Sequence, residues 1–176
     1  DSSSRPLDLV ITAVSSYAAS NVGLNKIKGH FGVVNLKAPS NSGTSSVALN
    51  YCFVDAATSE QVVLDSFQLS FFDFDESRDG KQRECLTTSG FASYDLAEGS
   101  SLTVSSASGS STFCSSEYGV GGDNPSDPRV LTDVQKQRTL AVNFQSTACL
   151  NITHSIGCCS ATGRNFRASF PLPRCP

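Results

Sequence analysis

The side chains best suited to chemistry lie in an acidic stretch between residues 71 and 85. Asp73, Asp75, Asp79 and Glu84 follow one another there at short intervals. Calcium in proteins is held by about six to eight oxygen ligands, which closely spaced carboxylates can supply. Two registers resemble an EF-hand loop, but each lacks either the turn glycine or the acidic twelfth position, and both flanks read as strand. The stretch therefore predicts an oxygen-rich cation site of another kind.

A second polar loop, residues 119–128, offers further oxygen ligands. It contains Asp123, Asn124 and Asp127 between glycines and prolines. Two loops that meet at one end of a β-structure can share an ion, so we predict a calcium site with the ligands Asp73, Asp75, Asp79, Glu84, Asp123 and Asp127. The alternative is turn chemistry, in which Asp75, Asp79 and Asp127 accept hydrogen bonds from their own backbone.

A binding function is favoured over catalysis. The candidates for contacting a glycan are Asp123, Asn124, Tyr94 and Tyr118, although the sequence has no Trp to provide a larger stacking surface. The sequence has only two His residues, and it lacks a nucleophile elbow, a phosphate loop and a metalloprotease motif. We expect a non-catalytic module that binds a glycan. The alternative is a structural subunit that contacts other protein chains in an extracellular, luminal or surface assembly, such as a cell wall, a flagellar hair or a photosynthetic complex.

Seven cysteines indicate an oxidising compartment. The chain has no Cys-x-x-Cys pair, so a structural zinc site is poorly supported. We predict disulfides without assigning their pairing, expect adjacent cysteines to bond to different partners, and expect the odd cysteine to be free or to link two chains. The cysteines are Cys52, Cys85, Cys114, Cys149, Cys158, Cys159 and Cys175.

Other features agree with secretion. Asn151-Ile152-Thr153 is an N-glycosylation acceptor, although so short a motif also arises by chance. The chain begins with Asp1 and has no Met, as expected once a signal peptide has been removed. We predict a secreted or cell-surface protein, with an oxidising lumen as the alternative.

Charge and hydropathy exclude two classes of partner. The net charge of −3 disfavours nucleic acid as a partner. No apolar run approaches the roughly 20 residues of a membrane-spanning helix, so membrane insertion is not expected.

Short segments of alternating apolar and polar residues, separated by Gly, Ser, Asn and Asp, predict an all-β protein. Thr132, with Gln135 three residues later, predicts the capped start of one short helix near residues 132–138. The 176 residues suit a single disulfide-stabilised domain over 1–176, an antiparallel β-sandwich of jelly-roll-like topology. Strands are expected at 7–14, 30–36, 46–54, 61–75, 91–96, 102–106, 111–116, 139–144, 149–155 and 165–170.

Several segments resemble a family of secreted β-sandwich modules of marine algae, including dinoflagellates, haptophytes and stramenopiles. They are Phe53 to Thr58, Phe67 to Asp75 with its Phe-Phe-Asp-x-Asp motif, Ser89 to Tyr94, Tyr118 to Pro128 with Asp-Asn-Pro-x-Asp-Pro, Leu131 to Arg138, and Gly163 to Phe166. The resemblance spans most of residues 30 to 170 and implies a secreted or surface module in a unicellular alga. It implies no catalytic residue, because no activity is settled for the family. The cysteine pair and the cysteine-bearing tail depart from it.

Overall fold

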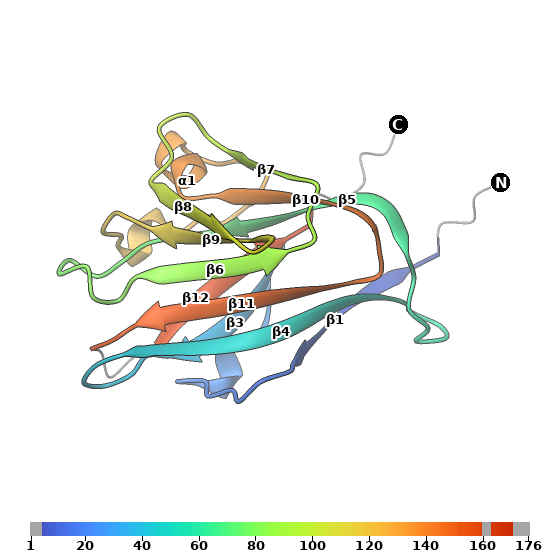
Figure 1. Cartoon of the computed structure of the whole chain (residues 1–176), viewed down its shortest axis with the longest axis horizontal. Coiled ribbons are helices and arrows are strands. Elements are labelled where there is room, and N and C mark those ends of the chain that lie inside the picture. Colours follow the sequence, from blue (N-terminus) through green and yellow to red (C-terminus); the bar gives the residue numbers. More distant parts are fainter. Residues whose placement is uncertain (1–4, 160–162, 171–176) are drawn as a thin grey trace.

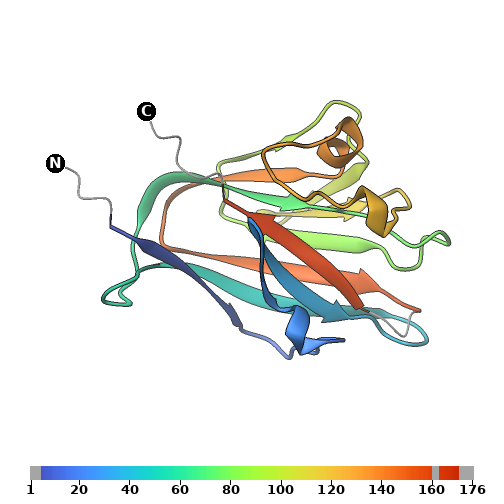
Figure 2. The same ribbon diagram turned by 180° about the vertical axis from the view of Figure 1, so that it is seen from behind.

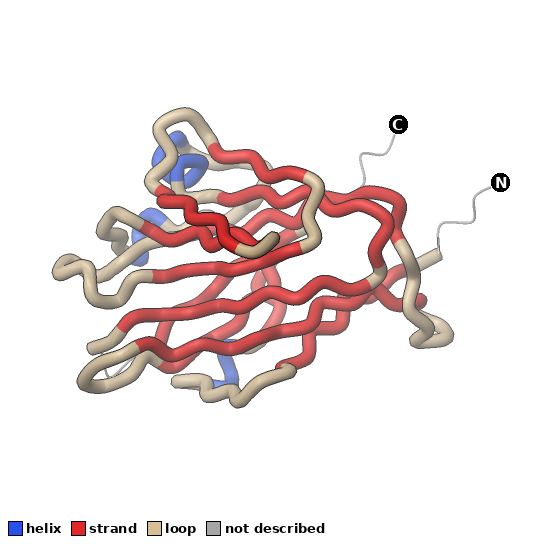
Figure 3. The backbone as a smooth tube through the Cα atoms, in the orientation of Figure 1, coloured by secondary structure: helices blue, strands red, loops and turns tan. Residues whose placement is uncertain are grey.

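Two antiparallel six-stranded sheets face each other in the computed structural model, which describes residues 5–159 and 163–170 (Figures 1 and 3). Sheet A has the order β1 (Leu7–Ala13), β4 (Thr44–Asp55), β11 (Cys149–Gly157), β6 (Glu84–Ser89), β9 (Ser110–Ser115) and β8 (Leu102–Ala107). Sheet B has the order β2 (Lys26–Lys28), β3 (Phe31–Lys37), β12 (Gly163–Ser169), β5 (Leu64–Phe72), β10 (Leu140–Thr147) and β7 (Ser93–Leu96). This arrangement confirms the predicted all-β sandwich.

Most connections cross from one sheet to the other, which gives the sandwich its jelly-roll-like character. The chain passes between sheets at each link from β3 to β8 and again from β9 to β12. The hairpins β2–β3 and β8–β9 each stay within one sheet. Figure 2 shows sheet B from behind, with β12 and β3 side by side. Strands distant in sequence are therefore neighbours throughout the fold.

The alternation of residue types decides which side of each strand is buried. In β4, Val47, Leu49, Tyr51 and Phe53 point into the sandwich, while the residues between them face outward and are partly exposed. Side chains alternate between the two faces of a strand, so the apolar set of each sheet meets that of the other. One shared apolar core results, with residues from both sheets.

Helical structure is limited to short segments. The helix α1 (Asp133–Gln137) begins at Thr132, whose hydroxyl accepts from the backbone N–H of Gln135, and the Gln135 side chain accepts from the backbone N–H of Thr132. The predicted capping box is thus confirmed. Two 3-10 turns, η1 (Val22–Leu24) and η2 (Gly121–Asp123), complete the helical elements of the described residues. No helix in that part of the chain has the length and hydropathy needed to cross a membrane.

Three strands differ from the prediction. The strand expected over 61–75 spans only Leu64–Phe72, and Val63 is 62% exposed. Strand β6 was not predicted, because its inward positions are Glu84, Leu86 and Thr88, a set that hides the apolar alternation. The short strand β2 at the edge of sheet B was also not predicted.

Three disulfides support an oxidising, extracellular environment for the chain. Cys52–Cys149 and Cys85–Cys114 each join residues directly opposite in paired strands of sheet A. The third joins Cys158 to Cys159, so the expectation that these neighbours bond to different partners is wrong. The other four cysteines of the described residues are already paired across strands, and the chain turns at Cys159, which has a φ of 113°. Cys175 lies outside the described residues.

Candidate functional site

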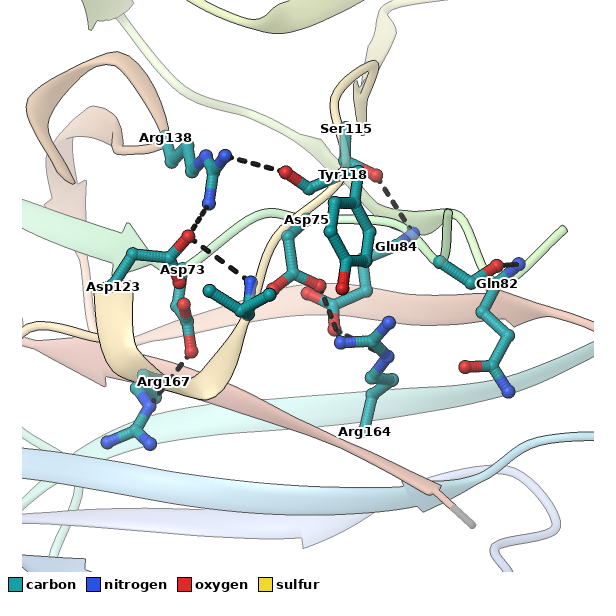
Figure 4. A network of polar contacts seen from close by, with 12 residues as sticks. Asp73, Asp75, Gln82, Glu84, Ser115, Tyr118, Asp123, Arg138, Arg164 and Arg167 are labelled. Carbon is teal, nitrogen blue, oxygen red and sulfur yellow. Dashed lines mark hydrogen bonds and ion pairs between the residues drawn. The ribbon is translucent and has the colours of Figure 1, made fainter. Parts of the chain in front are cut away.

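A polar pocket of about 160 Å³ lies at the end of the sandwich where β6 and β12 begin. The acidic segment that follows β5 and the loop around η2 meet the two strands there, so the two loops predicted to share a site do meet (Figure 4). The pocket is lined by Asp73, Asp75, Glu84, Gly121, Asn124, Gly163, Arg164 and Asn165.

The carboxylates after β5 are placed by buried phenylalanines that precede and separate them. Phe71 and Phe74 belong to the main core, while Phe72 packs in a second cluster on the other face of sheet B with Phe31. Asp73 has a φ of 69°, a left-handed conformation that Asp tolerates better than bulky residues do. Buried phenylalanines on both faces of sheet B therefore hold Asp73 and Asp75 at the pocket.

Three of the predicted metal ligands converge. Carboxylate oxygens of Asp73, Asp75 and Asp123 lie within 4.8 Å of one another. Glu84, which is 3% exposed, lines the same pocket, and its backbone N–H donates to the hydroxyl of Ser115. Four carboxyl groups thus share a small and partly buried volume.

Each of the three aspartates is paired with an arginine from a distant segment. Arg167 Nε lies 3.2 Å from Asp73 Oδ2, and Arg164 Nη1 lies 2.6 Å from Asp75 Oδ1. Arg138, just after α1, binds Asp123 Oδ2. Arg164 also approaches Glu84, with 3.8 Å between Nε and Oε1. Three guanidinium groups therefore face four carboxyl groups, which leaves one negative charge uncompensated when all are ionised.

The acidic groups titrate abnormally because burial and mutual repulsion disfavour their charged forms. Burial, followed by the charge of Asp75, raises the pKa of Asp73 to about 7 despite Arg167. Burial also raises the pKa of Asp75, against the opposing effect of Arg164. The pKa of Glu84 is raised well above its usual value by burial and then by Asp75. A bound cation would relieve this repulsion.

Two hydrogen bonds connect the η2 loop to α1 and to Arg138, the residue that follows it. The side chain of Gln135 donates to the carbonyl of Asp123 at 3.0 Å, and Arg138 Nη2 donates to the carbonyl of Tyr118 at 2.8 Å. Asp123 Oδ1 is buried and has no hydrogen-bond partner among the described residues. A Cβ atom at Gly119 would collide with the Asp75 side chain, so glycine is required where the loop passes over this carboxylate.

Two of the six predicted ligands lie away from the converging carboxylates. Asp79 is exposed and accepts from the Ser77 hydroxyl at 2.6 Å and from the backbone N–H of Lys81. Asp127 is bound by Arg129, which lowers the pKa of its carboxyl. Neither belongs to the group of converging carboxylates. Turn chemistry, the alternative interpretation, describes both residues.

The predicted glycan-contacting residues are also separated. Asn124 lines the pocket, beside Asp123. Tyr118 has an exposed ring that the Arg78 guanidinium covers at 5.4 Å, while its carbonyl is held by Arg138. Tyr94 is not a lining residue; it packs edge-on against Phe91 and Phe113.

Sequence reasoning missed the three arginines. Arg138 and Arg164 stand inside the segments that carried the family resemblance, yet nothing in the sequence pairs either with an aspartate. Arg167 lies between Phe166 and Ala168 of β12, whose side chains point into the core. Its own side chain therefore points outward, where an arginine is expected to be solvated and gives no sign of a partner. The only signal in the sequence was the position of Arg167 within a predicted strand, and this position does not indicate which carboxylate it contacts.

Comparisons with known proteins provide a likeness of fold. No protein-family model matches the chain, and no curated protein matches it. A solved structure that resembles it is the N-terminal domain of the Streptococcus gordonii adhesin Sgo0707, with a TM-score of 0.49 and 12% identity. The match covers 73% of this chain, and it spans 28% of the length of that structure. A likeness this distant carries no argument about what this chain binds.

Proposed function

We propose that the protein is a non-catalytic extracellular binding module that holds calcium in its acidic pocket and contacts a glycan there. The observation that carries this proposal is the convergence of Asp73, Asp75 and Asp123 at a polar pocket of about 160 Å³. Cross-strand disulfides make the surrounding sandwich suited to an oxidising exterior. Assignment to the marine algal family remains part of the proposal.

Calcium fits the donor set of the pocket. It takes about six to eight oxygen ligands in flexible geometry, and aspartate carboxylates with amide oxygens are among its usual ligands. Asp73, Asp75 and Asp123 offer the carboxylates, while Asn124 adds an amide oxygen at the lining. The raised pKa of Asp73 means that protons and a cation compete for the same oxygens near neutral pH.

A glycan fits the remaining chemistry of the pocket. Hydroxyl groups of a sugar donate to carboxylates and accept from guanidinium and amide groups, and Arg164, Asn124 and Asn165 stand beside the acids. The partly exposed ring of Tyr118 lies on the adjoining loop, and the face that Arg78 does not cover can stack on a sugar. The mixed lining distinguishes this pocket from a purely acidic cation site.

The first experiment measures thermal unfolding of the oxidised protein in calcium and in excess chelator. A ligand that binds only the folded state raises the melting temperature. We expect a calcium-dependent rise that Asp123→Asn abolishes and that Asp79→Asn, outside the pocket, leaves intact. An equal melting temperature with and without calcium in the unaltered protein would refute the calcium site.

A second experiment separates the glycan from the ion. Binding to a glycan array in calcium should be saturable, competed by free sugar and reduced by Asn124→Ala. If no glycan on the array binds although calcium still raises the melting temperature, the glycan proposal is refuted. The protein would then be a module that calcium stabilises.

A second candidate function, subunit of an assembly, is favoured by strand β1. This edge strand of sheet A pairs with β4 on one side only, and Leu7, Val10 and Ile11 are between 37% and 45% exposed. An apolar edge strand with free backbone groups is a template for pairing with another chain.

Native mass spectrometry and a non-reducing gel test this alternative. We expect an assembly through β1 to be lost in Val10→Lys and retained in Val104→Lys, a substitution on edge strand β8 at the far side of the same sheet. Monomeric protein at all concentrations would refute it. A disulfide-linked multimer that persists in Val10→Lys would instead assign the contact to the odd cysteine.

A further inference from the structure

We infer that Asn151 carries an N-linked oligosaccharide that covers the outer face of sheet A. The acceptor sequence Asn151-Ile152-Thr153 lies within β11. Asn151 is exposed, whereas Leu150 and Ile152 on either side of it are buried, so the asparagine points away from the core. It is the single Asn-x-Ser/Thr sequence of the chain in which x is not proline.

The amide of Asn151 presents the reacting atom outward. Its Oδ1 accepts a hydrogen bond of 2.9 Å from Asn50 Nδ2 on the neighbouring strand β4. Its Nδ2, the atom that bears a glycan, has no hydrogen bond within the described part of the chain. The side chain is thus oriented by its oxygen, and its nitrogen remains accessible.

The surroundings of Asn151 have room for a sugar. On the same face, Thr153 pairs with Thr87 of β6 and Cys149 pairs with Cys52 of β4. Figure 1 shows β4, β11 and β6 side by side across the front of the molecule. The outward residues of these three strands are small or uncharged, so a glycan meets neither a bulky aromatic group nor a buried charge there.

The disulfides provide an independent indication of the compartment. Cys52–Cys149 lies beside Asn151, and Cys85–Cys114 lies on the next pair of strands. Such bonds form in the secretory pathway, where N-glycosylation takes place. In the transfer, Asn151 Nδ2 bonds to the anomeric carbon of a lipid-diphosphate-linked oligosaccharide. The bond from that carbon to the diphosphate oxygen breaks, and one amide proton leaves to solvent.

The glycan would leave the acidic pocket open. Glu84 pairs with Ile156, five residues along β11 from Asn151, which corresponds to about 17 Å at the rise of an antiparallel strand. Glu84 points inward at the pocket end, whereas Asn151 points outward. The outer face of sheet A is therefore assigned to the glycan, and ligand binding is assigned to the end of the sandwich.

The test uses the full chain secreted from a eukaryotic cell line. Glycopeptide mass mapping of the unaltered protein should show a hexose-containing adduct on the peptide with Asn151, and peptide N-glycosidase should remove it. The adduct should be lost in Asn151→Gln and in Thr153→Ala, and kept in Thr153→Ser, which preserves the acceptor sequence. An unmodified peptide from the unaltered secreted protein would overturn the inference, whatever the folding of the variants.

Discussion

Arg164 and Asp75 form an ion pair across 89 residues of sequence, with 2.6 Å between Nη1 and Oδ1. Asp75 lies three residues after the end of β5, and Arg164 is the second residue of β12. The Arg164 guanidinium also approaches Glu84, so it acts as an internal counter-ion of these two carboxylates. The charge balance of the site therefore depends on how much this arginine competes with an added cation.

Replacing Arg164 should change the response to calcium. Arg164→Gln removes a positive charge beside Asp75 and Glu84, so their repulsion increases when no cation is bound. We expect a lower melting temperature in chelator and a larger calcium-dependent rise than in the unaltered protein. Thermal unfolding across a calcium titration measures both quantities. Arg129→Gln, which breaks an ion pair outside the pocket, is the control and should leave the calcium-dependent rise unchanged.

Asp73 should make the protein less stable as the pH rises. Its pKa is about 7 in the folded chain and near its ordinary value of 3.8 when unfolded, so the folded state holds the proton more tightly. In chelator, the free energy of unfolding should fall between about pH 4 and pH 7, by roughly 3–4 kcal/mol for this group. Asp73→Asn should flatten this fall. A fall of the same size in the variant would assign the pH dependence to other groups.

His154 should act in the opposite direction. It is fully buried beside Tyr51, with 3.0 Å between Nε2 and the phenol oxygen, and burial lowers its pKa to about 3. The folded state excludes the proton that the unfolded chain binds below about pH 6.5, so stability is lost as the pH falls from there. The double variant Tyr51→Phe/His154→Phe removes both polar partners together. Denaturant unfolding should then show a weaker loss of stability in acid.

The three disulfides should contribute unequally. Cys52–Cys149 closes a loop with a sequence separation of 97, and its removal should cost about 4 kcal/mol through the greater freedom of the unfolded chain. Cys158–Cys159 joins neighbours and closes almost no loop. We expect Cys52→Ala/Cys149→Ala to lower the denaturant midpoint strongly and Cys158→Ala/Cys159→Ala to change it little. Equal losses would contradict the loop-entropy explanation.

The parts of the fold that follow from local pattern were predictable. Alternation of apolar and polar residues is a property of consecutive positions, and it identified most of the strands as well as the sandwich class. The capping box at Thr132 and Gln135 is equally local, because both partners lie within one turn. Strand β6 was not predicted, because the polar residues Glu84 and Thr88 occupy inward positions where the alternation pattern requires apolar residues.

The sequence by itself therefore determined the all-β class, the short helix, the oxidising environment and the acidic residues available for a site. Only the tertiary structure decided which of them meet. Asp73, Asp75 and Asp123 converge, while Asp79 and Asp127 stay in their own turns. The arginine partners and the cross-strand cysteine pairs depend on register between strands far apart in the chain. Side-chain alternation within one strand carries no information about which other strand lies beside it, so these pairings come from the packed sandwich as a whole.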